Sequence, residues 1–172
     1  MATAGKDLSH YDKASLPDAS RMHIGIVVSE WNDDITENLF KGAQETLIDC
    51  GVPKDAIFKY DVPGSFELVY GCRHMQNSIF TTANDQQSKT VDAVIAIGSV
   101  IRGETAHFDF VCQGVTNGIK DLNLNTSGIP VIFCVLTDDT HAQSVARSGG
   151  IHGNKGSEAA IAAIKMAALR LR

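Results

Sequence analysis

Short runs of β-branched and other apolar residues alternate with segments of helical periodicity along this chain of 172 residues. Four of these runs predict strands, at 23–30, 56–62, 93–100 and 131–136. Because strands that alternate with helices join through right-handed crossovers, they form a parallel sheet with helices on both faces. The pattern therefore predicts an α/β fold, a three-layer α/β/α sandwich around a four-stranded parallel sheet.

Helical periodicity predicts five helices between and after these strands. The first begins at a cap residue, Asn32 or Asp33, and ends before Gly51. The others are expected at about 65–80, 108–122, 139–148 and 155–172. Residues 1–21 are polar and irregular, so we expect an N-terminal arm followed by a single domain over 22–172.

Charge and composition argue against nucleic acids and membranes as partners. A formal net charge of −5 without clustered Lys and Arg argues against nucleic acid as a partner. Residues 1–20 contain no apolar signal-peptide core and 18 apolar residues never run together, so we expect no membrane partner and a cytoplasmic location.

Neither the cysteines nor the histidines are spaced like metal ligands. The four cysteines lack CxxC spacing, and we expect them to be reduced thiols: Cys50, Cys72, Cys112 and Cys134. The six histidines form no HExxH or HxH pair, so no metal site is expected. A GxGxxG motif after the first strand and the GxxxxGK[ST] motif are also missing, which disfavours dinucleotide and NTPase sites.

The segments that follow the four strands are the candidates for a ligand site. Open parallel sheets bind ligands at the carboxyl ends of their strands. Four segments reach that edge: Trp31, 63–67, 99–107 and Thr137. The third, SVIRGETAH, brings a glycine, the Thr105 hydroxyl and His107 to the start of a helix. Free N–H groups and the helix dipole favour an anion there, so His107 is a candidate proton carrier beside a phosphate site. The alternative is an ordinary surface histidine.

Three other side chains have two interpretations each. Trp31, the only tryptophan, could stack on a flat heterocycle or serve in packing. Glu67 could accept hydrogen bonds from ligand hydroxyls or interact favourably with a helix N-terminus. Arg147 could clamp a phosphate or satisfy the last carbonyls of a helix.

Taken together, these segments resemble the lumazine synthase family over residues 22–172. The resemblance is carried in order by SEWND, VPGSFEL, AIGSVIRGETAHFDFVC, PVIFCVLT, ARSGG and HGNKGSEAAIAAIKMA. It implies a flavodoxin-like fold and a transferase of riboflavin biosynthesis that uses neither a cofactor nor a metal. The implied reaction condenses 5-amino-6-(D-ribitylamino)uracil with 3,4-dihydroxy-2-butanone 4-phosphate and yields 6,7-dimethyl-8-ribityllumazine, phosphate and water.

The resemblance also implies a role for each matching residue. His107 is the implied proton donor and acceptor. The substrate-binding residues are Trp31, Ser65, Phe66, Glu67, Ser99, Val100, Ile101 and Phe133, and the phosphate-binding residues are Glu104, Thr105, Arg147 and Lys155. Two positions depart from the commoner family pattern: Trp31 replaces a phenylalanine, and Glu104 stands where small residues also occur. Glu104 would therefore bind phosphate through its backbone N–H, with its carboxylate turned away.

Members of this family form pentamers in which neighbouring subunits share each site, and some pentamers assemble into icosahedral sixty-mers. The resemblance thus implies that Phe133, Arg147 and Lys155 face Trp31, Glu67 and His107 of a neighbour, with riboflavin synthase as a candidate partner. Only seven residues separate Arg147 from Lys155, a spacing that permits the sixty-mer. Two rivals remain: a non-catalytic lumazine- or riboflavin-binding relative, and a protein whose main role is to form a shell.

Overall fold

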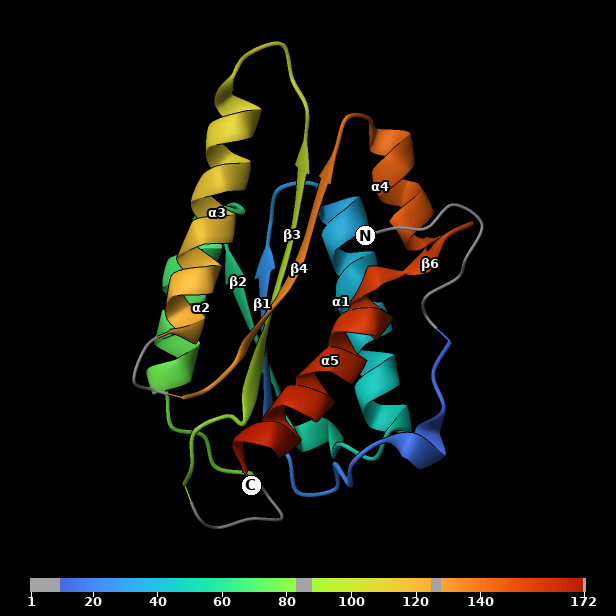
Figure 1. Cartoon of the computed structure of the whole chain (residues 1–172), viewed down its shortest axis with the longest axis vertical. Coiled ribbons are helices and arrows are strands. Elements are labelled where there is room, and N and C mark those ends of the chain that lie inside the picture. Colours follow the sequence, from blue (N-terminus) through green and yellow to red (C-terminus); the bar gives the residue numbers. More distant parts are fainter. Residues whose placement is uncertain (1–9, 83–87, 125–127, 172) are drawn as a thin grey trace.

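Four parallel strands form the central sheet of the computed structural model, which describes residues 10–82, 88–124 and 128–171. They are β1 (Ile24–Ser29), β2 (Ile57–Val62), β3 (Ala93–Ile101) and β4 (Val131–Asp138), and their order is β2-β1-β3-β4. All four arrowheads point the same way in Figure 1, so the carboxyl ends of the strands meet at one edge of the sheet.

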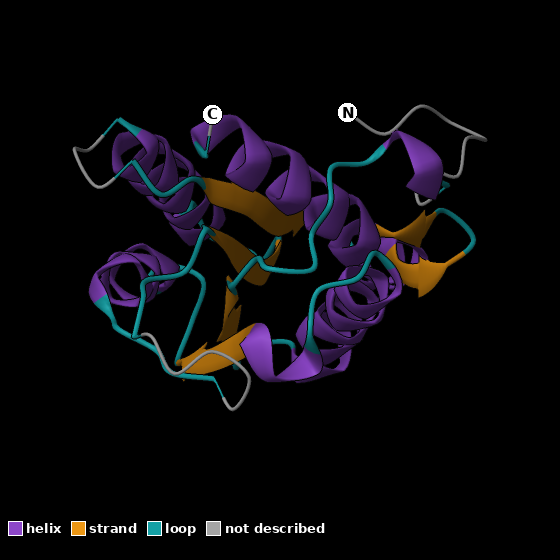
Figure 2. Ribbon diagram, turned by 90° about the horizontal axis from the view of Figure 1, so that it is seen from below, coloured by secondary structure: helices purple, strands orange, loops and turns teal. Residues whose placement is uncertain are grey.

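Helices cover both faces of this sheet. They are α1 (Asp33–Asp49), α2 (Leu68–Asn77), α3 (His107–Asn123), α4 (His141–Arg147) and α5 (Lys155–Arg170). Figures 1 and 2 show α2 and α3 on one face, and α1 and α5 with the short α4 on the other. The predicted three-layer sandwich with a four-stranded parallel sheet is confirmed.

The alternation of side chains along β3 explains why its sequence is apolar throughout. Val94 and Ala96 belong to the core beneath α2 and α3, whereas Ile95 and Ile97 belong to the core beneath α1 and α5. Because successive side chains of a strand point to opposite faces, a strand covered by helices on both sides needs apolar residues at every position.

The layer of α1 and α5 is held together by close helix packing. Ala159, Ala160, Ala163 and Ala167 of α5 are buried in its core. At the start of α5, a Cβ on Gly156 would overlap the backbone carbonyl of Leu39 in α1. Small residues therefore set the short distance between these two helices.

Several element boundaries differ from the sequence-based expectation. Helix α2 ends at Asn77 instead of about Phe80, because Phe80 pairs with Lys89 in an isolated β-bridge. Helix α4 begins at His141, two residues later than expected, because Thr140 is its N-cap and forms a capping box with Gln143. A small antiparallel pair, β5 (Ser148–Gly150) and β6 (Gly153–Asn154), was not anticipated.

The described part of the N-terminal segment packs against the sandwich. The Tyr11 hydroxyl donates to the Asp49 carboxylate at 2.9 Å, and the Lys13 ammonium lies 3.2 Å from the same group. Ala19 is buried in the core beneath α1 and α5. A domain boundary at 21/22 stays a prediction, and residues 1–9 of the expected arm lie outside the described residues. Among the described residues, no helix is long and apolar enough to cross a membrane.

The close approach at Gly156 generates a stability prediction. Gly156→Ala should lower the free energy of unfolding by about 2–3 kcal/mol, because the added methyl group must displace rigid backbone of α1. Urea unfolding at one fixed protein concentration measures this loss. Gly103→Ala is the matched control, since its Cβ meets nothing within 4 Å. Equal stability of the two variants would contradict the packing argument.

Candidate active site

A pocket of about 880 Å³ opens at the carboxyl edge of the sheet. Its walls come from the segments that follow β1 and β2, from the last residues of β3 and from the start of α3. The lining residues are Trp31, Asn32, Pro63, Gly64, Ser65, Phe66, Glu67, Ser99, Val100, Ile101, His107, Phe110 and Val111. A volume of this order suits a small organic ligand.

The connection from β1 to α1 holds the tryptophan at the pocket rim. Trp31 is 73% exposed, so its ring is not part of the core. Asn32 follows with φ 59° and ψ 51°, the one non-glycine residue with positive φ among those described. Asn32, one of the two caps expected, is the N-cap of α1, but its side chain makes no capping bond. It donates instead to the Ser99 carbonyl at 2.9 Å. This bond ties the end of β1 to the end of β3.

The connection from β2 to α2 contributes the polar groups on the second side. Glu67 is exposed directly before α2, and a Cβ on Gly64 would lie 2.9 Å from its carboxylate. The Ser65 hydroxyl is buried and has no hydrogen-bond partner among the described residues. Because an unsatisfied buried hydroxyl costs free energy, Ser65 is suited to bond a ligand that enters the pocket.

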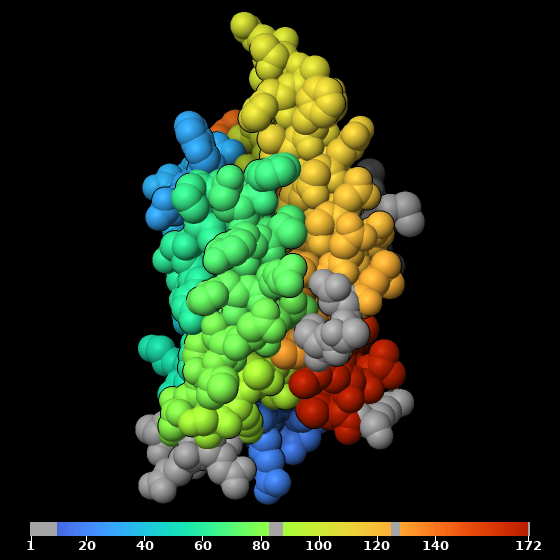
Figure 3. Space-filling model, turned by 90° about the vertical axis from the view of Figure 1, so that its left-hand side faces the viewer, coloured from blue at the N-terminus to red at the C-terminus, as the bar shows by residue number. Residues whose placement is uncertain are grey.

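The connection from β3 to α3 brings the candidate proton carrier to the pocket. His107 is the first residue of α3, and its backbone N–H donates to the Thr105 hydroxyl at 3.4 Å. Phe110 and Val111 lie three and four residues further on and line the same pocket. Neither residue was predicted from the sequence, although the helical i, i+3, i+4 spacing places them on the face of His107. Figure 3 shows this segment, in yellow, projecting beyond the face formed by α2 and α3.

Arg102 anchors the β3–α3 connection. Its guanidinium donates to Asp139 at 2.7 Å and to Asp109 at 3.4 Å, and it lies 4.1 Å from the centre of the Phe108 ring. The hydrogen bond to Asp139 raises the pKa of Arg102 further, so the arginine stays charged. This role of Arg102 could not be predicted from the sequence, because its partners lie in two other segments.

Five of the sequence-predicted residues do not line this pocket, and three of them lie in other parts of the fold. Phe133 lies on the edge strand β4, partly buried against the core beneath α2 and α3. Arg147 is 8% exposed and donates to the His152 carbonyl at 2.5 Å and to Glu158 at 2.6 Å. Lys155 lies 3.8 Å from the same carboxylate. Within one chain, these cations are therefore held by Glu158, away from the pocket.

Eight of the predicted residues do come together, and the other two, Glu104 and Thr105, lie beside them in sequence. Trp31, Ser65, Phe66, Glu67, Ser99, Val100, Ile101 and His107 all line the pocket. Glu104 and Thr105 are exposed in the connection directly before His107. Glu158 was missed by sequence analysis, although its position three residues after Lys155 allows a contact within the first turn of α5.

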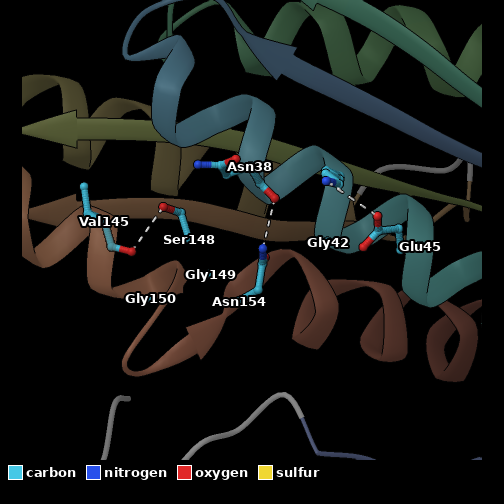
Figure 4. Close-up of a pocket in the computed structure, with 9 residues that line it drawn as sticks. Asn38, Gly42, Glu45, Val145, Ser148, Gly149, Gly150 and Asn154 are labelled. Atoms are coloured by element: carbon cyan, nitrogen blue, oxygen red, sulfur yellow. Dashed lines mark hydrogen bonds and ion pairs between the residues drawn. The ribbon is translucent and has the colours of Figure 1, made fainter.

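A smaller hollow of about 310 Å³ lies between α1 and the β5–β6 hairpin. Figure 4 shows Asn154 reaching from the hairpin to the carbonyl of Asn38, at 2.9 Å. The ionisable residues that line this hollow are Lys41 and Glu45, which pair with each other at 4.0 Å on the surface. It contains no aromatic ring or histidine, so the larger pocket is the candidate active site.

All four cysteines are free thiols, as expected. Cys72 and Cys134 are buried, and burial raises the pKa of Cys134 to about 12. A thiol with so high a pKa is not a nucleophile near neutral pH. The described residues also contain no group of three or more His, Cys, Asp and Glu side chains that could hold a metal ion.

Fold and site together define a flavodoxin-like α/β protein with a small-molecule pocket at the carboxyl edge of its sheet. The sequence model described as 6,7-dimethyl-8-ribityllumazine synthase matches residues 21–170. The chain therefore belongs to the 6,7-dimethyl-8-ribityllumazine synthase family.

Relatives of that name cover almost the whole chain. The protein of Flavobacterium johnsoniae is 62% identical over 170 residues, 99% of this chain and 84% of the relative. The protein of Christiangramia forsetii is 61% identical over 99% of this chain and 95% of its own length. The protein of Porphyromonas gingivalis is 51% identical over 98% of both chains.

The contacts of Arg102 generate a prediction about local mobility. Arg102→Ala should speed backbone hydrogen exchange in residues 103–106, because the connection loses its links to Asp139 and Asp109. The midpoint of global unfolding should hardly change, since exposed ion pairs contribute little to stability. Lys120→Ala, which removes a surface pair with Asp121, serves as the control. Unchanged exchange in 103–106 would show that Arg102 does not anchor the connection.

Proposed function

We propose that this chain condenses 5-amino-6-(D-ribitylamino)uracil with 3,4-dihydroxy-2-butanone 4-phosphate, as the transferase of riboflavin biosynthesis that forms 6,7-dimethyl-8-ribityllumazine. The observation that carries the proposal is the meeting of Trp31, Glu67 and His107, from three different connections, in one pocket. An exposed ring, a carboxylate and an imidazole are the groups needed to hold a polyhydroxylated heterocycle beside a proton carrier.

The uracil substrate is proposed to enter between the ends of β1, β2 and β3. Trp31 stacks on its ring, while Glu67, with Ser65 and Phe66, holds the ribityl chain. The buried hydroxyl of Ser65 supports this assignment, because a ribityl hydroxyl would supply its missing partner. Ser99, Val100 and Ile101 present backbone groups to the edge of the ring, where the last residues of β3 line the pocket.

The butanone phosphate is proposed to bind next to the start of α3. Ala106, the N-cap, makes no side-chain hydrogen bond to α3, so the start of the helix presents the positive end of its dipole. Thr105 adds a hydroxyl, and Glu104 contributes its backbone N–H. The Glu104 side chain is exposed and is free to point its carboxylate into solvent, away from the anion.

The chemistry requires proton transfers but no redox step. The 5-amino group adds to the ketone, loss of water gives an imine, phosphate is eliminated, and the ribitylamino nitrogen closes the ring with loss of water. His107 moves the protons, a contribution of about 100- to 10,000-fold. Orientation of the two substrates side by side saves roughly 7–11 kcal/mol of barrier.

The site is proposed to be completed by a neighbouring subunit of a homopentamer. Four aromatic side chains at and near the pocket are 59–76% exposed: Trp31, Phe66, Tyr70 and Phe110. Exposed apolar groups gathered at one place mark an interaction surface. The neighbour would supply Phe133 over the ring, and Arg147 and Lys155 to the phosphate.

Assembly beyond the pentamer is inferred from what is known of the family. Association into a sixty-subunit shell and contact with riboflavin synthase are part of the proposal. A cytoplasmic location is supported by the four free thiols, which suit a reducing compartment.

Of the two rival functions, a binding relative without turnover would keep Trp31 and Glu67 but would have no use for His107, which lines the pocket.

Removal of the imidazole tests catalysis. His107→Ala should lower kcat by about 100- to 10,000-fold while the protein stays folded, because the side chain is exposed. Lumazine fluorescence follows the reaction after the two substrates are mixed. His74→Ala, an exposed histidine on α2, is the control. A wild-type rate no faster than the uncatalysed condensation would exclude the enzyme and leave the binding relative.

Mixed assemblies test the shared site. His107→Ala and Arg147→Ala subunits should each be nearly inactive alone, whereas oligomers refolded from an equal mixture should regain about a quarter of the wild-type activity. Random assembly pairs an intact His107 with an intact Arg147 at that fraction of heterologous interfaces. Light scattering should give a multiple of the 18.4 kDa chain mass, five or sixty. No recovery in mixed oligomers would place both residues in one subunit's site.

A further inference from the structure

A row of hydrogen-bonded polar groups lies between the end of β3 and α4, on the face of the sheet opposite α2 and α3 (Figure 1). The Ser99 hydroxyl donates to the Ser144 hydroxyl at 3.5 Å, and Ser144 donates to the Asp138 carboxylate at 2.7 Å. Ser99 is 2% exposed and Ser144 is fully buried. These two hydrogen bonds join the end of β3 to the first turn of α4 and to the end of β4.

The direction of these side chains shows that they do not face the ligand. A Cβ on Gly98 would lie 2.7 Å from the Ser65 hydroxyl, so this position faces α2 and the pocket. Because side chains alternate along a strand, Ser99 points to the opposite face, where it meets α4. Ser99 therefore lines the pocket with its backbone, and its side chain holds that backbone in place.

Ser99 is held from two sides. On one side its carbonyl accepts the 2.9 Å bond from Asn32, which lies in the β1–α1 connection. On the other side its hydroxyl meets Ser144, whose own proton is committed to Asp138. The longer contact, Ser99 to Ser144, gains strength because the carboxylate polarises the hydroxyl that accepts it.

Asp138 also touches the connection that carries His107. Its carbonyl accepts a 3.0 Å bond from the backbone N–H of Arg102, the first residue after β3. Ser144 is in turn placed by the capping box of Thr140 and Gln143, which starts α4. Asp138 and Ser144 are thus fixed points against which the last residues of β3 are aligned.

We infer that Asp138 and Ser144 are positioning residues that align the Ser99–Ile101 backbone with the heterocycle of the uracil substrate. The inference rests on the proposed function, in which these three residues read the edge of the ring. Neither side chain touches the substrate. Their loss therefore weakens recognition of the uracil and leaves recognition of the butanone phosphate, at the start of α3, almost unchanged.

The experiment measures the KM of each substrate separately, by lumazine fluorescence, in the full-length assembled protein. Ser144→Ala and Asp138→Ala should raise the KM for the uracil about threefold to tenfold, the effect of one hydrogen bond, with less than a twofold change for the butanone phosphate. Asp138→Asn keeps an oxygen that accepts from Ser144 and should return the KM for the uracil to within about twofold of wild type.

Ser78→Ala is the hydroxyl-deletion control, because Ser78 donates to the His74 carbonyl just after α2. Equal increases in both KM values, accompanied by a lower unfolding midpoint, would show general loosening and overturn the inference. An unchanged KM for the uracil in both alanine variants would also overturn it. If Ser144→Ala does not fold, the KM for the uracil in Asp138→Ala, compared with that in Asp138→Asn, tests the inference.

Quenching of Trp31 fluorescence by the lumazine product separates this inference from the proposed function. A wild-type protein that forms and binds lumazine, with variants that match it, refutes only the positioning role. A wild-type protein that neither forms nor binds lumazine refutes both. Weaker product binding by Ser144→Ala and restored binding by Asp138→Asn would support the inference without any turnover.

Discussion

The pairing of β3 with β1 on one side and β4 on the other is the interaction on which the rest of the structure depends. Residues 93–97 of this strand have no exposed surface, because neighbours in the sheet and helices on both faces enclose them. A one-residue slip in register would move each of these side chains into the opposite core, where side chains of different shape are packed around it. Its carboxyl end, Ser99–Ile101, stays paired with β4 and is consequently a rigid base for the pocket.

Local patterns were enough to predict the sheet and most of the helices, since apolar periodicity records which faces are buried. The β5–β6 hairpin could not be predicted in this way. Its strands, SGG and GN, have no β-branched residue, and the turn depends on Gly149 and Gly153 at φ 114° and 77°. The end of α2 was likewise set by a partner distant in sequence, Lys89, which draws Phe80 into a bridge.

The site was predictable where its residues directly follow strands, because topology alone brings the ends of parallel strands to one edge. Trp31, Glu67 and His107 are of this kind. Residues whose role depends on a tertiary contact were not predictable. Asn32, one of the two residues expected to cap the first helix, is the N-cap of α1, but its side chain bonds to Ser99 instead of capping. Arg102 has partners 7 and 37 residues away in sequence. Sequence motifs name the groups that meet a ligand more readily than the groups that hold them in place.

The ion pair between Arg147 and Glu158 affects how strongly this arginine can bind a phosphate group. Both side chains are at most 19% exposed, and they lie 2.6 Å apart. A guanidinium already matched by a carboxylate has less charge to offer a second anion, and Glu158 also lies near the ammonium of Lys155. In the proposed shared site, a phosphate group would therefore be held by partly neutralised cations. The weaker attraction would favour release of inorganic phosphate before the next substrate binds.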